Sequence, residues 1–322
     1  MPPAATNVRR PINQRRSLGA ALLLACLTVA VACNEPAADG GATASGLLAL
    51  AAGPDGTSLT GWEGAATDGI TVDLPAGDTS WISVGRANVL AATLADGGLA
   101  TSDPLHLGKP LDWRLVKPVD PSGAAPPAQA YFATWDPSGG LIAELGGDLA
   151  SGDGVSVVLI DPSVSTIFQI AIDRSVVAAP PAWISADRLV VVTGDTADPA
   201  TTIVDTSNGE LSDGPTDARL VATSANLSRV ATMAGPGEPV VIRDLTGWLA
   251  GDGSAIGSVE PPDGVQTAVA FALDTSGQRL AIAWITDAGT VELAVHDGRS
   301  SWRRTAEPAL GNARGAAVAW RR

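Results

Sequence analysis

Four segments of this chain end in the same short pattern, in which an apolar run closes on an aspartate and a turn-rich stretch follows. The aspartates lie 44, 39 and 53 residues apart. The chain therefore repeats a unit of roughly 45 residues, the period typical of a β-propeller blade of four strands. This pattern constrains the fold far more than the activity. The four segments are Val157-Val158-Leu159-Ile160-Asp161, Thr201-Thr202-Ile203-Val204-Asp205, Val240-Val241-Ile242-Arg243-Asp244 and Leu293-Ala294-Val295-His296-Asp297.

Two further pieces recur ahead of these aspartates. One is an apolar strand that ends near an anchor residue, and the other is a second strand that follows after a tight Asp, Asn or Ser-Gly turn. Asp and Asn suit such turns because their side chains bond to the nearby backbone. The pattern predicts four strands per unit. The anchors, spaced 48, 42, 48 and 47 residues apart, are Trp135, Trp183, Ala225, Leu273 and Trp320.

The last anchor, Trp320, leaves too little chain after it to begin a new blade. The N-terminal part supplies the missing strands near residues 47–51, 58–62 and 70–74. We therefore expect an all-β propeller of four-stranded antiparallel blades, closed by pairing of the N- and C-terminal strands, which removes free sheet edges. Seven blades are the alternative if 44–78 folds differently. The six expected blades are 45–76 with 315–322, 79–118, 129–174, 176–213, 217–262 and 266–308.

The turn Asp136-Pro137-Ser138-Gly139, together with the strand-end aspartates, resembles the TolB-type, WD-like propeller repeats of bacterial envelope proteins. The resemblance covers roughly residues 129–320. The Gly-His and Trp-Asp pairs of true WD repeats are missing, apart from Trp135-Asp136, which sits at a different place in the blade. The resemblance implies a propeller that works outside the cytoplasm.

The start of the chain has the features of a secretory signal. Residues 1–16 carry four arginines and no acidic residue, and an uncharged run follows from Ser17 to Ala32. This run is shorter than the ~20 residues that a membrane-spanning helix needs. A basic segment, a short apolar segment and a small-residue exit are typical of a bacterial signal peptide. We therefore expect a signal peptide at 1–32, a flexible tether at 33–45 and one propeller domain at 46–322.

The exit Ala30-Val31-Ala32-Cys33 resembles the lipobox of bacterial lipoproteins. The resemblance implies that Cys33 is diacylated and becomes the new N-terminus. Leu23-Leu24-Ala25-Cys26 matches the lipobox more closely, but membrane-like sequence continues after Cys26, so Cys33 is the expected lipidation site. If both cysteines are incidental, the protein is secreted instead. Arg15-Arg16 also faintly resembles a twin-arginine export signal, which leaves the export route open.

Composition excludes several classes of function. The net charge is −14 and basic residues form no stripe. Because neutralisation of phosphates dominates binding to nucleic acid, we expect no nucleic-acid partner. An acidic chain is also not attracted to anionic lipid, so membrane contact must come from a lipid anchor.

The sequence offers no catalytic or cofactor-binding motif. Its two histidines, His106 and His296, lack supporting context, and we expect His296 to be a surface residue at a strand end. The expected catalytic, cofactor and metal-ligating residues are therefore none. Acidic loops at 146–154 and 251–253 could supply oxygen ligands for calcium, but they lack a full ligand series. The repeated carboxylates are interpreted as structural turn residues on the outer rim: Asp161, Asp205, Asp244 and Asp297.

These observations favour a monomeric, membrane-anchored extracytoplasmic propeller that binds an envelope protein, peptide or glycan without catalysis. The alternative is a hydrolase or lyase on the same scaffold, which would require several ionisable side chains that converge in the central funnel. A redox propeller is disfavoured by the shortage of His and Cys. Trp248 and Trp302 fall in outer turns, where they either form a binding surface or pack between blades.

Overall fold

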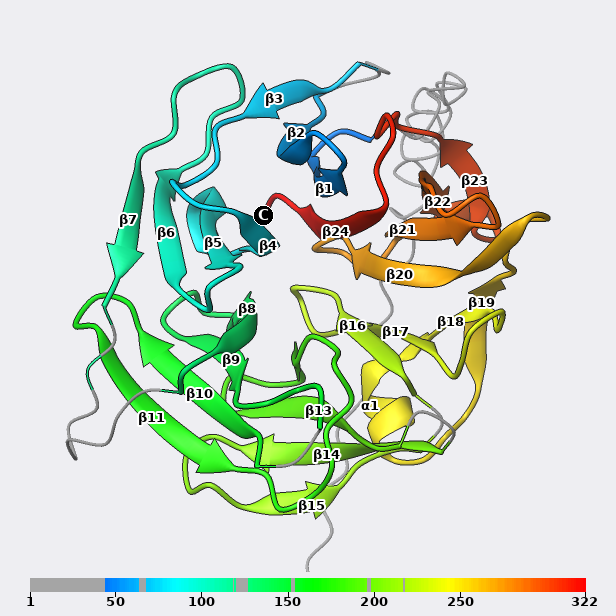
Figure 1. Cartoon of the computed structure of the whole chain (residues 1–322). Helices are drawn as coiled ribbons and strands as arrows, with labels where there is room; N and C mark the ends of the chain where they lie inside the picture. The colour runs from blue at the N-terminus through cyan, green and yellow to red at the C-terminus, as the bar shows by residue number, and fades with distance from the viewer. Residues whose placement is uncertain are drawn as a thin grey trace, which may run out of the picture. The chain divides into compact units, whose positions relative to one another are not determined.

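Six four-stranded antiparallel sheets surround a central axis in the computed structural model of this chain (Figure 1). The structure describes residues 44–63, 68–117, 119, 127–151, 154–195, 198–216 and 218–322, all within the unit Gly41–Arg322. The expected signal peptide and Cys33 lie outside the described residues. Within those residues the all-β, six-bladed architecture and the expected blade limits are confirmed.

Each blade is a simple meander whose first strand lies next to the axis. Blades 1 and 2 consist of β24 (Gly315–Trp320), β1 (Leu47–Gly53), β2 (Gly56–Gly61) and β3 (Ile70–Val72), and of β4 (Thr79–Val84), β5 (Val89–Leu94), β6 (Leu99–Pro104) and β7 (Trp113–Val116). Blades 3 and 4 consist of β8 (Ala130–Trp135), β9 (Ile142–Gly146), β10 (Ser156–Asp161) and β11 (Thr166–Ala171), and of β12 (Ala182–Trp183), β13 (Arg188–Gly194), β14 (Pro199–Asp205) and β15 (Leu211–Asp213). Blades 5 and 6 consist of β16 (Leu220–Thr223), β17 (Arg229–Met233), β18 (Val240–Asp244) and β19 (Ala255–Val259), and of β20 (Val265–Leu273), β21 (Arg279–Thr286), β22 (Val291–Asp297) and β23 (Arg303–Ala306).

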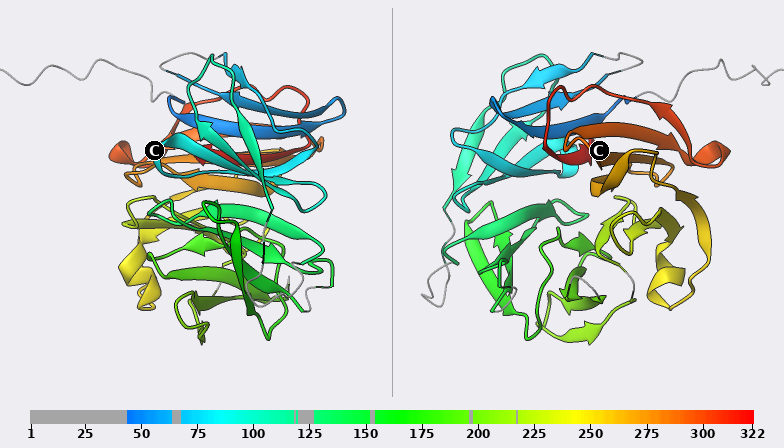
Figure 2. Two further views of the ribbon diagram at one scale, coloured as in Figure 1. Left: turned by 90° about the vertical axis from the view of Figure 1, so that its left-hand side faces the viewer. Right: turned by 45° about the vertical axis from the view of Figure 1, so that its right-hand side comes forward.

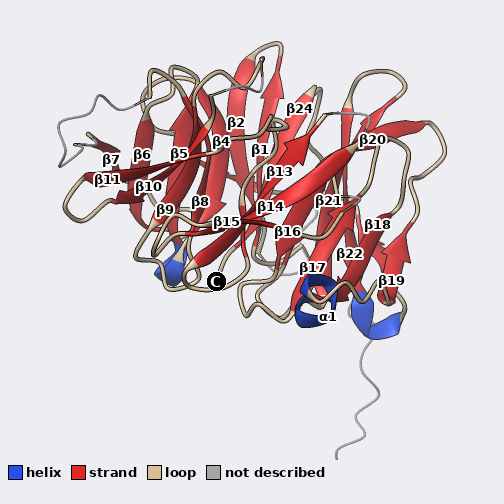
Figure 3. Ribbon diagram, turned by 90° about the horizontal axis from the view of Figure 1, so that it is seen from below, coloured by secondary structure: helices blue, strands red, loops and turns tan. Residues whose placement is uncertain are grey.

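Helical structure among the described residues is confined to short turns. These are α1 (Leu245–Leu249), η1 (Arg86–Asn88) and η2 (Gly298–Ser300), and Figure 3 shows that helical turns lie along one side of a body otherwise made of strands. None of the described helices has the length and apolar character required to cross a membrane.

The core is divided among the blade interfaces. In β1, Leu47 and Ala49 belong to a cluster shared with blade 6, whereas Leu48 and Leu50 belong to a cluster shared with blade 2. Successive side chains of a strand point to opposite faces, and a neighbouring blade covers each face. This explains why so many strands are apolar at nearly every position.

The other four junctions have equivalent clusters among the described residues. The views in Figure 2 show the sheets packed face to face around the ring. Tryptophans contribute some of the largest buried side chains, and Trp62 and Trp284 are fully buried in clusters that involve blade 6.

Ring closure joins the two ends of the domain. β24 pairs antiparallel with β1 over six residue pairs, from Leu47 opposite Trp320 to Ala52 opposite Gly315. The Arg321 amide extends this ladder by donating to the Gly46 carbonyl at 2.7 Å. Figure 1 shows the blue β1 beside the red β24. The expected completion of the first blade by the last strand is therefore confirmed.

Stability should depend strongly on the closing strand. Val318 of β24 is 4% exposed and packs at the junction of blades 1 and 6. We expect Val318→Asp to lower the free energy of unfolding by at least about 3 kcal/mol, because it buries an unpaired charge. Urea denaturation would measure this loss. The same substitution at Val164, which is 65% exposed, should change stability by less than about 0.5 kcal/mol; equal losses at the two sites would contradict this account.

Candidate functional site

The four repeated aspartates end the third strands of blades 3 to 6. The Asp161, Asp205 and Asp297 carboxylates accept the backbone N–H two residues further on, from Ser163, Ser207 and Arg299 respectively. Asp244 instead accepts the Gly247 N–H and caps α1. The four lie in separate blades, and none lines a cavity described below.

Their electrostatics follow from these turns. The Ser163 hydroxyl lowers the pKa of Asp161, and the Ser207 hydroxyl does the same for Asp205. Hydrogen bonds from Arg299 lower the pKa of Asp297. All three carboxyls are therefore more firmly ionised than usual, which suits turn capping and opposes a role as a general acid.

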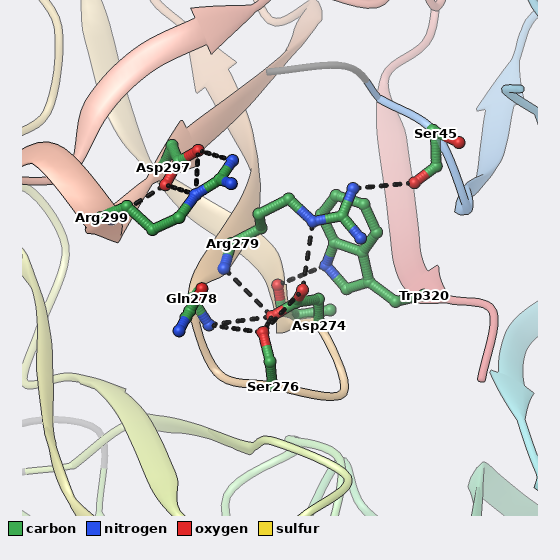
Figure 4. A network of polar contacts seen from close by, with 9 residues as sticks. Ser45, Asp274, Ser276, Gln278, Arg279, Asp297, Arg299 and Trp320 are labelled. Atoms are coloured by element: carbon green, nitrogen blue, oxygen red, sulfur yellow. Dashed lines mark hydrogen bonds and ion pairs between the residues drawn. The ribbon is translucent and has the colours of Figure 1, made fainter. Parts of the chain in front are cut away.

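Turns between the first and second strands form a second set of carboxylate sites. Asp274 accepts the backbone N–H groups of Gln278 and Arg279, and it also pairs with the Arg279 guanidinium at 3.1 Å (Figure 4). Arg279 then lies 4.4 Å over the Trp320 ring and donates to the Ser45 carbonyl. The turn between β20 and β21 of blade 6 thus contacts the closing strand β24 of blade 1.

The inner strands of all six blades line a central cavity of about 150 Å³. Its wall is mainly apolar, with residues such as Val84, Val221 and Phe271. Four tryptophans also line it, and three of them end inner strands. The tryptophans are Trp81, Trp135, Trp183 and Trp320.

The cavity wall has almost no ionisable group. Of the described residues that line it, Arg322 alone is ionisable. Arg322 is exposed as a residue, yet burial lowers the pKa of its guanidinium. Neither His106 nor His296 lines the cavity. The described part of the wall of the central cavity therefore has no pair of acid and base side chains, which proton transfer in hydrolysis usually requires.

A second cavity, of about 550 Å³, is lined by the beginnings of inner strands and by loops between second and third strands. It shares Leu220 and Val269 with the central cavity, so both border the same stretch of β16 and β20. Asp195 and Arg219 give this second cavity a mixed charge. The propeller therefore offers two different recesses near its axis.

Glu144 is a buried carboxyl that the sequence analysis did not single out. It lies in β9, within the apolar run from Leu141 to Leu145, and is 2% exposed. The Thr93 hydroxyl of blade 2 lies 3.5 Å from its Oε1 and also accepts the Ala133 N–H. Burial raises the pKa of Glu144 to about 8, so the group is mostly neutral at pH 7. It joins blades 2 and 3 and lies outside the lining of the central cavity.

Glu144 should make stability depend on pH. Between pH 4.5 and 8 the folded chain holds a proton on Glu144 that the unfolded chain has lost. As the pH rises through this range, the free energy of unfolding should therefore fall by up to about 1.4 kcal/mol per pH unit. Glu144→Gln should flatten this slope, whereas the exposed Glu292→Gln should not. Urea denaturation between pH 5 and 8 checks this, and parallel curves for the wild type and Glu144→Gln would contradict it.

Two expectations from the sequence can be compared with burial. His296 is 7% exposed, with its Nδ1 3.3 Å from the Trp302 carbonyl, so the expectation of a surface residue was wrong. The turn after β22 folds back over the ring, and burial lowers the pKa of His296. Trp248 and Trp302 are also buried, at 5% and 6% exposure, and pack between blades.

Within the described part of the chain, no group of three or more His, Cys, Asp or Glu residues is arranged to hold a metal ion. In the acidic loop after β9, the Asp148 carboxylate accepts the Ala150 and Ser151 N–H groups. That carboxylate is thus already used to order its own loop.

Neither a family model nor a curated protein matches the sequence. Solved structures do match. TolB from Acinetobacter baumannii has a TM-score of 0.61 at 12% identity, over 84% of this chain and 66% of that chain. A chain of the nidogen/laminin complex has a TM-score of 0.58 at 12% identity, over 85% of this chain and 98% of that one.

A putative TolB from Agrobacterium tumefaciens has a TM-score of 0.54 at 9% identity, over 85% of this chain and 98% of that one. A puromycin hydrolase mutant has a TM-score of 0.51 at 13% identity, but this chain spans only 54% of its length. At such identities the likeness concerns the fold. The chain therefore folds as a six-bladed β-propeller, and its fold is similar to that of TolB.

Proposed function

We propose that this protein is a membrane-anchored extracytoplasmic lipoprotein whose propeller is a non-catalytic binding module for an envelope protein, peptide or glycan. The observation that most supports the proposal is the composition of the wall of the central cavity. It combines apolar side chains and tryptophans with a single ionisable residue, Arg322, among the described lining. Aromatic and apolar surfaces suit binding, whereas hydrolysis requires positioned acids and bases.

The structural neighbours support this reading at the level of the fold. Two are TolB proteins, and one is a propeller from the nidogen/laminin complex. A bacterial envelope location agrees with these neighbours and with the basic, then apolar, N-terminal segment. A hydrolase is the second candidate, favoured by the puromycin hydrolase neighbour.

Partner binding should depend on Arg322, which lines the central cavity. In a pull-down from envelope extract, we expect Arg322→Glu to reduce retention of the partner at least about tenfold, because it inverts the charge of this side chain. Lys117→Glu makes the same charge change near the outer strand β7 and should leave retention unchanged. Equal retention of the partner by the two variants would contradict binding at the central cavity. Hydrolysis of an extract component by the purified chain would favour the second candidate.

The lipid anchor rests on the segment Ala30-Val31-Ala32-Cys33. We expect Cys33→Ala to release the protein from the membrane fraction of its host, because the thioether-linked diacyl group cannot form. Cys26→Ala should remain membrane-bound. Mass spectrometry of the mature N-terminus checks the modification directly. An unmodified Cys33 in the native host would refute lipidation at Cys33, and release by Cys26→Ala alone would move the anchor to Cys26.

A further inference from the structure

The second cavity lies where three blades meet at Leu220, at the start of the inner strand β16. Leu220 packs against the cluster between blades 4 and 5 that contains Val177. It also packs against the cluster between blades 5 and 6 that contains Met233. All three residues line the cavity, which measures about 550 Å³. This volume falls within the range of about 300–1,000 Å³ that is typical of small-molecule sites.

The wall of the second cavity is largely apolar. Val176 and Val177 come from the segment before β12, whereas Leu220 and Val269 come from the inner strands β16 and β20, which lie side by side (Figure 1). Leu220 and Val269 are only half-buried, so part of their apolar surface stays in contact with water. An apolar ligand that covers this surface would gain from the hydrophobic effect.

One cation lines the same cavity. Arg219 immediately precedes β16 and is half-buried. Its backbone N–H donates to the Met233 carbonyl at 2.7 Å, which holds its main chain beside the apolar wall. Unlike Arg174, which pairs with Asp213, Arg219 forms no ion pair with any described residue. Because a guanidinium can only donate hydrogen bonds, its best partner is an anion.

The cavity also contains one carboxylate, which restricts the charge of a ligand. Asp195 follows β13, and its Oδ1 accepts the Asp198 N–H at 2.7 Å. Asp195 thus orders its own loop, and no ion pair joins it to Arg219, which is likewise a described residue. A dianionic ligand would be repelled by Asp195. A ligand with a single negative charge is therefore favoured.

We propose that the second cavity binds an apolar monocarboxylate such as a medium-chain fatty acid. In this arrangement the apolar chain lies against Val176, Leu220 and Val269. The carboxylate pairs with Arg219, because the planar guanidinium can donate to both carboxylate oxygens at once. The site has its own cation and does not depend on the envelope partner proposed for the central cavity.

Calorimetric titration with sodium decanoate tests this site on the mature chain, residues 33–322. Cys33→Ala is present throughout, so that no lipid anchor competes for the probe. We expect saturable binding of one decanoate per chain. Hexanoate should bind at least about tenfold more weakly, because it buries less apolar surface. Decanol lacks the charged acceptor and should also bind at least about tenfold more weakly.

Substitution of the arginine locates the carboxylate. Arg219→Gln should weaken decanoate binding at least about tenfold, since it removes a charged donor, and Arg219→Lys should lose less because it keeps the charge. Arg229→Gln is the matched control. Arg229 is also a half-buried arginine of blade 5 without an ion pair to a described residue, but it lines neither cavity. Its substitution should leave decanoate affinity unchanged.

A second variant tests the site without removing the arginine. Ala178 is exposed and lines the second cavity. Ala178→Glu adds a negative charge there and should weaken decanoate binding at least about fivefold. Ala52→Glu makes the same change at an exposed position of blade 1 and should have no effect on decanoate affinity. Melting curves establish folding, and if Arg219→Gln does not fold, Ala178→Glu decides.

The outcomes separate this inference from the proposed function. Absence of saturable decanoate binding to the otherwise unchanged, folded chain overturns the inference. Equal affinity for decanoate and decanol overturns it too, as does unchanged decanoate affinity in the deciding variant. If decanoate does not bind while the envelope partner is still retained, only the fatty-acid site fails. If decanoate binds as expected and no preparation retains a partner, the fatty-acid site stands and the envelope-partner proposal fails.

Discussion

The pairing of β24 with β1 is the interaction on which the rest of the structure depends. It gives blade 1 its inner strand, and with it one side of the central cavity. It also completes two interface cores, because Val318 packs toward blade 6 while Ala317 and Ala319 pack toward blade 2. A propeller without this ladder would expose two sheet faces and an unpaired strand edge at once.

The fold could be predicted from the sequence because its signals are local and repeated. Turn residues such as Asp136 and Asp274 lie at corresponding positions of different blades, and each bonds to its own backbone. The spacing from Trp135 to Trp320 then gives the blade length. Even blade 2, where residues 105–112 replace the aspartate turn between β6 and β7, is identified by its neighbours on either side.

The candidate site could be predicted only in part, because its features arise between blades. Trp135, Trp183 and Trp320 are equivalent in sequence pattern, yet of the three only the Trp135 indole N–H has no partner among the described residues. The Trp135 ring packs closely against Gly85 of the neighbouring blade, a contact that the sequence around Trp135 does not indicate. The burial of Glu144 and His296 could not be predicted from the sequence either. A neighbouring blade or a returning turn covers them, and the residues around them do not indicate this.

The contact between β1 and β24 also sets the order in which the chain can fold. Blades 2 to 6 are each built from a continuous stretch of sequence, so their hairpins can form from local contacts. Blade 1 must wait until Trp320 is available to meet Leu47. Contacts so distant in sequence form slowly, because a long loop must first be closed. Until β24 pairs with β1, the inner edge of β1 has no partner strand and could pair with a strand of another chain.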